Sequence, residues 1–169
     1  MLRTHLYLIP VLLLLSLNAC AKTKKVTSSA AFVVLDATEQ RTNPGRQESR
    51  PFTNYRAQIV WRSKSAPKTF FWRPDAGSWL ETSIAKPEKR PGINPGDMMI
   101  IEKHIGHSAV RFGDTIIITT VRHSHDEEPM PSAVKKMPVK SIFFQTAASG
   151  AKWMSVPVTT RKFPTLNMP

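Results

Sequence analysis

The chain has 169 residues, 41% of them hydrophobic, and a formal net charge of +12 at pH 7. This length suits a single domain with a core of its own. Cys20 is the only cysteine, which excludes a disulfide framework and, beyond that residue, any thiolate metal ligand or cysteine nucleophile.

The first segment has the features of a secretory signal. Residues 6–17 form an apolar run of 12 residues that follows the basic Arg3. A stable transmembrane helix needs about 20 apolar residues, whereas a run of this length suits the central region of a signal peptide. We therefore expect residues 1–19 to be removed on export. The alternatives are a signal peptide that ends in a chance cysteine and an uncleaved membrane anchor.

The sequence Leu17-Asn18-Ala19-Cys20 resembles the lipobox of bacterial lipoproteins, in which a dedicated signal peptidase cuts before the cysteine. Leu17, Ala19 and Cys20 fit the pattern, and Asn18 is a less common residue at its position. The resemblance implies that the Cys20 thiol carries a diacylglycerol and that residues 20–29 form a lipidated tether. Two or three acyl chains, at about 0.8 kcal/mol per buried CH₂ group, make a lasting membrane anchor.

The residues after Cys20 indicate a location. In many Gram-negative lipoproteins an Asp directly after the cysteine retains the protein in the inner membrane, and here that residue is Ala21. The resemblance therefore implies the outer membrane. The basic stretch 22–25 lacks the acidic residues that favour surface display in Bacteroidota. We expect a periplasm-facing protein, with the cell surface and the inner membrane as alternatives.

The charge of the chain indicates its partners. Residues 1–19 contain one basic residue and no acidic residue, so their removal leaves a net charge of +11. Such charge is typical of nucleic-acid binding, but an exported protein is not expected to meet nucleic acid. The expected partners are the membrane, through the lipid anchor, anionic envelope components and other envelope proteins. The alternative is a soluble surface whose charge has no specific partner.

The rest of the chain predicts strands rather than helices. After Cys20 it contains only three leucines but many β-branched and aromatic residues, and no window shows a sustained helical period. Tyr55, Ala57, Ile59 and Trp61 alternate with polar residues, as in a strand with one buried face. In chain order, the expected strands are 30–37 and 54–62, followed by hairpins formed by 68–85, by 97–104 with 114–123, and by 140–146 with 152–160.

Short strands with regular turn signals predict an all-β fold. Residues 30–169 are expected to form one immunoglobulin-like antiparallel β-sandwich of about seven to eight strands, with a β-barrel as the alternative. Stretches rich in Pro and Gly at 43–51, 86–96 and 127–138 predict loops. The core is expected to hold most of the aromatic residues, namely Trp61, Phe70 or Phe71, Trp72, Trp79, Phe143, Phe144 and Trp153.

The layout of lipobox, basic tether and small sandwich is similar to that of small lipoproteins of Bacteroidota. This second resemblance rests on the order of the segments and not on a motif. It implies a fold and a compartment, and it assigns no activity.

No catalytic motif is complete. A nucleophile elbow needs Gly-x-Ser-x-Gly, and residues 106–110 (GHSAV) have Val110 in place of the second glycine. Asp75, Asp97 and Asp114 lie at expected turns, where hydrogen bonds from the backbone explain carboxylates. No Gly-x-Gly phosphate loop occurs in the sequence. We therefore nominate no catalytic residue.

The histidines form two pairs along the chain, His104 with His107 and His123 with His125. Imidazole with carboxylate suits zinc, and imidazole with thioether suits copper. If the strands 97–104 and 114–123 form a hairpin, His123 lies about eight residues along the strand from the loop that holds His104 and His107. At about 3.3 Å per residue the two pairs are then about 26 Å apart, which is too far for one zinc site. We expect no site made of all four, and a metal that does bind would use His123 and His125.

The expected function is a lipid-anchored, non-catalytic binding or structural module of the cell envelope, without a cofactor. Arg56, Arg62 and Arg73 are the candidate binding residues, because they are expected to form a basic row that faces outward. The alternative from another class is an extracytoplasmic metal-binding lipoprotein, and a hydrolase comes third.

Overall fold

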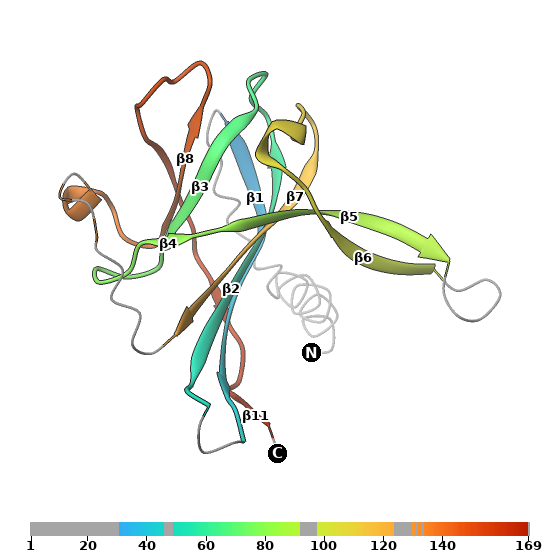
Figure 1. Ribbon diagram of the computed structural model, residues 1–169, viewed down its shortest axis with the longest axis vertical. Helices are drawn as coiled ribbons and strands as arrows, with labels where there is room; N and C mark the ends of the chain where they lie inside the picture. Colours follow the sequence, from blue (N-terminus) through green and yellow to red (C-terminus); the bar gives the residue numbers. More distant parts are fainter. Residues whose placement is uncertain are drawn as a thin grey trace, which may run out of the picture.

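The computed structural model describes residues 31–45, 49–91, 98–123, 130, 132 and 134–168. These residues form two packed β-sheets (Figure 1). The strands are β1 (Phe32–Asn43), β2 (Phe52–Trp61), β3 (Pro67–Arg73), β4 (Leu80–Glu81), β5 (Ser83–Pro91), β6 (Met98–His104), β7 (Thr115–His123), β8 (Ser141–Thr146), β9 (Met154–Pro157), β10 (Arg161–Lys162) and β11 (Leu166–Asn167). Within the described residues, the 3-10 helices η2 (His107–Ala109) and η3 (Val134–Lys136) lie in the connections. None of the described segments is a helix long and apolar enough to cross a bilayer.

The strand order is that of an immunoglobulin-like sandwich. The seven-stranded sheet runs β10-β1-β2-β7-β5-β6, with β11 also paired to β1, and the four-stranded sheet runs β4-β3-β8-β9. Within them, β1-β2-β7-β5 and β3-β8-β9 reproduce the A-B-E-D and C-F-G orders of the immunoglobulin constant type. The predicted fold class is confirmed, and the two separate sheets exclude a closed barrel. The described residues contain more strands than predicted. The additional strands are short: β4, β10 and β11 have two residues each, which is too few to show an alternating pattern.

The four-stranded sheet has a hydrophobic cluster on each of its faces. The inner cluster fills the space between the sheets and includes the predicted buried row of β2, which is confirmed; its aromatic members are Phe32, Tyr55, Trp61, Phe70, Trp72 and Phe144. The outer cluster consists of Trp79, Val134 and Phe143, with the partly buried Phe71, Met130, Met137 and Trp153 packed against them. Alternation along β3 and β8 explains the division, because successive side chains of a strand point to opposite faces. The aromatic residues expected in one core are thus divided between the inner and the outer cluster.

Two predictions about strand pairing are wrong. Residues 97–104 and 114–123 do not form a hairpin, because β6 pairs with β5, and β7 lies between β2 and β5. Residues 86–91 are not a loop but the second half of β5. The third predicted hairpin is confirmed as β8 with β9. The first is confirmed only as β3 with β4, because residues 83–85 belong to β5 and pair with β7 in the other sheet.

Pro87 made the second half of β5 look like a loop, and the pairing pattern explains why it is tolerated. The Ile105 N–H donates to the Ile84 carbonyl at 3.1 Å, which makes Ala85 and His104 a pair without mutual hydrogen bonds. Pro87 is two residues further along β5, so its nitrogen also points away from β6. There β5 has no second neighbour, since its pairing with β7 ends at Ala85. A proline on such an open edge removes no ladder bond.

The consequence is a projecting two-stranded hairpin, which we call the arm (residues 86–91 and 98–103). Figure 1 shows it extending sideways from the sandwich, with its outer end far from the other strands. Its only described strand pairing is between its own two strands.

Candidate ligand-binding cleft

A cleft of about 390 Å³ opens where one end of the seven-stranded sheet meets the four-stranded sheet. Segments far apart in the chain line it: β1, β2, β3 and β10, the turn after β3, and the connections before β8 and after β9. The lining residues are Glu39, Tyr55, Trp72, Pro74, Asp75, Lys140, Val158, Thr159, Thr160 and Lys162. Charged side chains of both signs therefore surround one concave surface.

Tyr55 and Trp72 are buried aromatic residues of the cleft lining. Their ring centroids lie 5.7 Å apart at 44°, and both residues are buried. Burial is the main cause that raises the pKa of the Tyr55 phenol above its usual value, and the negative charges of Glu39 and Asp75 add to it. The charge of Arg122 and its hydrogen bond to the phenol act in the opposite direction. The phenol stays neutral at physiological pH and can donate or accept a hydrogen bond.

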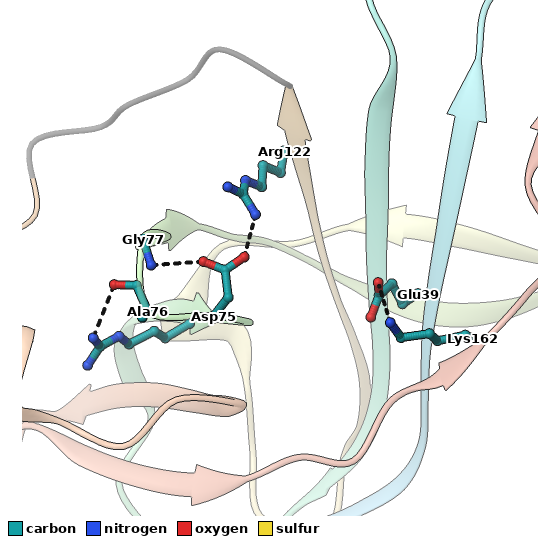
Figure 2. A network of polar contacts seen from close by, with 7 residues as sticks. Glu39, Asp75, Ala76, Gly77, Arg122 and Lys162 are labelled. Carbon is teal, nitrogen blue, oxygen red and sulfur yellow. Dashed lines mark hydrogen bonds and ion pairs between the residues drawn. The ribbon is translucent and has the colours of Figure 1, made fainter.

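Both carboxylates of the cleft already have partners, as Figure 2 shows. Glu39 accepts a hydrogen bond of 3.2 Å from the Thr160 hydroxyl and lies 3.7 Å from the Lys162 ammonium. Asp75 accepts 2.9 Å from the Gly77 N–H and forms an ion pair with Arg122. These contacts hold the two acids in place and balance their charge.

Lys140 is the cation of the cleft that no described carboxylate balances. Its φ of 54° is the only positive φ of a non-glycine residue among the described residues. The Lys140 carbonyl accepts a 2.7 Å hydrogen bond from the Val158 N–H. The side chain is exposed at the cleft, and no described carboxylate pairs with it. Strain of this kind concentrates at functional sites, so Lys140 is the first candidate for contact with an anion.

Of the three arginines predicted to form a basic outward row, Arg56 and Arg62 lie at the surface and Arg73 does not. Arg56 lies on the outer face of β2, where its guanidinium contacts Glu102 at 2.8 Å. Arg62 is exposed directly after that strand. Arg73 belongs to the other sheet and is only 3% exposed, so its placement on an outward row is corrected.

Arg73 instead binds backbone. Its guanidinium donates to the carbonyls of Val134 at 2.7 Å, of Ala76 at 3.3 Å and of Lys135 at 3.4 Å, and also to that of Met137. Trp72 faces the inner cluster, so alternation turns Arg73 to the opposite face of the sheet. There the guanidinium ties η3 and the turn after β3 to the sheet.

The described histidines lie on separate parts of the fold. His104 is exposed at the end of β6, His107 packs on Phe70 with ring centroids 5.9 Å apart, and His123 lies 5.9 Å from the ring of Phe52 at the end of β7. Burial lowers the pKa of His107, and Glu81 acts weakly against that shift. Within the described parts of the chain, no group of three or more His, Cys, Asp or Glu residues could hold a metal ion.

Two sequence predictions fall outside the described residues. His125 belongs to the segment 124–129, and the lipobox with Cys20 belongs to 1–30. Both stay predictions.

Reasoning from the sequence missed the cleft. It placed Tyr55 on a buried row and Asp75 at a turn, and both placements are confirmed, but it did not connect them. It did not single out Glu39, Lys140 or Lys162, and no motif marks them. No protein family model matches the chain, and no curated protein matches it either.

Proposed function

We propose that this chain is a cell-envelope lipoprotein, anchored by lipid at Cys20, and that its sandwich is a non-catalytic binding module. The lipobox resemblance supports the anchor. Ala21, in place of an Asp after Cys20, supports the outer membrane, and the basic stretch 22–25 supports its periplasmic face. The cleft supports the binding role. Its carboxylates are engaged in fixed contacts with Lys162, Thr160 and Arg122, which suits a preformed recognition surface.

The ligand that we propose is an envelope component that carries a carboxylate, such as the peptide part of peptidoglycan. Lys140 carries this proposal, because its ammonium lies at the cleft with no described carboxylate to balance it. The Tyr55 phenol and the hydroxyls of Thr159 and Thr160 supply neutral hydrogen-bonding groups nearby. A carboxylate at Lys140 would thus be held by a charge-assisted hydrogen bond and oriented by neutral ones.

The anchor is tested by the substitution Cys20→Ser. The wild type should take up a labelled fatty acid in growing cells, and the variant should take up none and keep its signal segment. Label on the variant, or no label on the wild type, would contradict the anchor.

The cleft is tested by calorimetry with peptidoglycan fragments that carry free peptide carboxylates, and with amidated fragments for comparison. Lys140→Gln should weaken binding about tenfold or more, since a hydrogen bond to a charged group contributes about 1.5–3 kcal/mol. Lys152→Gln is the control, because Lys152 is exposed in the turn between β8 and β9 and lies outside the cleft. Equal losses in both variants, or equal affinity for amidated fragments, would sink the proposal.

Lys140→Gly separates binding from folding. Glycine adopts the left-handed conformation without the steric cost that a side chain meets there. The variant should therefore bind poorly and yet be more stable than the wild type by about 1 kcal/mol, measured by urea unfolding. A variant that loses both binding and stability would show that Lys140 acts on the fold.

A further inference from the structure

The outer end of the arm exposes two large apolar side chains. Ile100 is 68% exposed and Met99 is 48% exposed, although both lie in the ordered strand β6. Since neighbouring residues of a strand point to opposite faces, one apolar side chain stands on each face of the arm. The sandwich covers neither of them.

A cation stands opposite each of these apolar residues. Lys89 pairs in register with Ile100, and Arg90 pairs with Met99. Paired residues of an antiparallel ladder have their side chains on the same face and in contact range. Each face of the arm thus presents one apolar side chain beside one long basic side chain.

Both described acidic residues of the arm have partners, Glu102 on the sandwich and Glu88 on the arm itself. Glu102 is bound by Arg56 at 2.8 Å on the sandwich. Glu88 is shared between Arg90 at 3.2 Å and Lys103 at 3.8 Å. No described carboxylate pairs with Lys89. The outer end of the arm therefore has an excess of positive charge next to its apolar residues.

We propose that the arm docks on an anionic lipid bilayer, with Met99 and Ile100 among the acyl chains and Lys89 and Arg90 at the phosphates. Apolar side chains that project from a fold are suited to the boundary between headgroups and acyl chains. Lys and Arg have stems long enough to keep their charge at the headgroups while the residue beside them inserts, and anionic lipid attracts that charge. The pairing of each apolar residue with a cation favours a lipid surface over a purely apolar protein groove. The docking depends neither on lipid at Cys20 nor on a ligand in the cleft.

The test places one fluorescent probe at the end of the arm. In the full-length chain, Cys20→Ser removes the only native thiol, and Ile100→Cys then supplies a single site for an environment-sensitive fluorophore. The protein is reconstituted with vesicles of phosphatidylglycerol and phosphatidylcholine, some of which carry a spin label in the acyl chains. The fluorescence of the probe should shift to the blue, and the spin label should quench it.

The matched control carries the probe at Phe112→Cys in the same background. Phe112 is 65% exposed, similar to Ile100, and lies in the turn before β7 rather than on the arm. The adjacent residue in the chain, Arg111, donates to the Ser108 and Val110 carbonyls. Whatever else attaches the chain to the vesicle acts on both probes alike, so quenching at position 100 should exceed that at position 112 severalfold.

A further pair of substitutions, Lys89→Gln with Arg90→Gln, should reduce the quenching at position 100 severalfold, and so should vesicles of phosphatidylcholine alone. Equal quenching at the two positions would overturn the proposal. It would also be overturned if the probe at position 100 became shielded only as the protein concentration rose, without quenching from the lipid, since that result indicates a second copy of the chain. Either failure would leave the lipidation test and the cleft test unaffected.

Discussion

The two faces of the four-stranded sheet are both buried but are covered in different ways. On β8, Phe144 packs in the inner cluster against Phe32 and Trp61, with ring centroids 5.3 and 5.5 Å apart. Phe143 packs in the outer cluster against Trp79 at 5.1 Å. The inner cluster is covered by a second sheet, whose strands are joined to one another by backbone hydrogen bonds. The outer cluster is covered by connections, which need another device to hold them.

Arg73 is that device. A buried guanidinium is costly unless its donors are satisfied. Here backbone carbonyls of η3 and of the turn after β3 bind the two terminal nitrogens, and Nε is buried without a described partner. A loop cannot form a ladder with a sheet, but a planar fork with five donors can bind several of its carbonyls at once. One side chain can therefore hold a covering layer of connections where strand pairing is absent.

The largest expected effect compares Phe144→Ala with Phe143→Ala. Both side chains are 1% exposed, so area alone predicts equal losses of stability. We expect Phe144→Ala to lower the free energy of unfolding by about 3–5 kcal/mol, because the second sheet cannot collapse into the cavity. Phe143→Ala should cost about 1–2 kcal/mol less, since the connections over it can move inward. Urea unfolding of the two variants measures the difference, and equal costs would mean that the two coverings are equally rigid.

The next effect concerns Arg73→Met. The substitution fills a similar volume but leaves the carbonyls of Val134, Ala76 and Lys135 without their donor. We expect a loss of about 2–3 kcal/mol, because a buried acceptor left unsatisfied costs about 1–3 kcal/mol. Hydrogen exchange should speed up first around 134–137 and around Trp79, and later in the inner cluster.

Arg73→Lys is the control for charge. A lysine keeps the positive charge but cannot reach carbonyls on both sides with its compact ammonium, so it should restore less than half of the lost stability. Full recovery by lysine would show that charge, and not the fork of donors, holds the outer layer.

The sequence predicted what alternation and turn signals determine. The buried row of β2 and the hairpin of β8 with β9 follow from a period of two residues and a short turn, and both are confirmed. The partner of β6 did not follow, because 97–104 and 114–123 are equally apolar and adjacent in the chain. The true partner, β5, contains Pro87 and many charges, and a local pattern cannot show that one of its edges stays open.

The cleft was out of reach for a related reason. Glu39, Tyr55, Asp75, Lys140 and Lys162 come from separate segments, and only the packing of the two sheets brings them together. The position of Arg73 was equally hidden, since an arginine after a run of aromatic residues is as compatible with an exposed strand end as with a buried clamp. The sequence determines which face a residue takes, whereas the covering of that face depends on the rest of the chain.

The smallest expected effect distinguishes the two clusters by pH. His107 packs on Phe70 of the inner cluster, and its ring Nε2 is buried without a described partner. Burial lowers its pKa in the folded protein below that of the unfolded chain, which is about 6.5. Between these two values the unfolded state binds more protons, so stability is complete above about pH 6.5 and falls as the pH drops toward the folded pKa. No such effect is expected from Arg73, whose guanidinium stays charged throughout this range.

The free energy of unfolding of the wild type should therefore fall between about pH 7.5 and about pH 5.5. That of His107→Phe should fall less, because phenylalanine keeps the ring contact and cannot take up a proton. If the wild type and the variant lose stability in parallel, another group titrates and the inner cluster carries no histidine that senses pH.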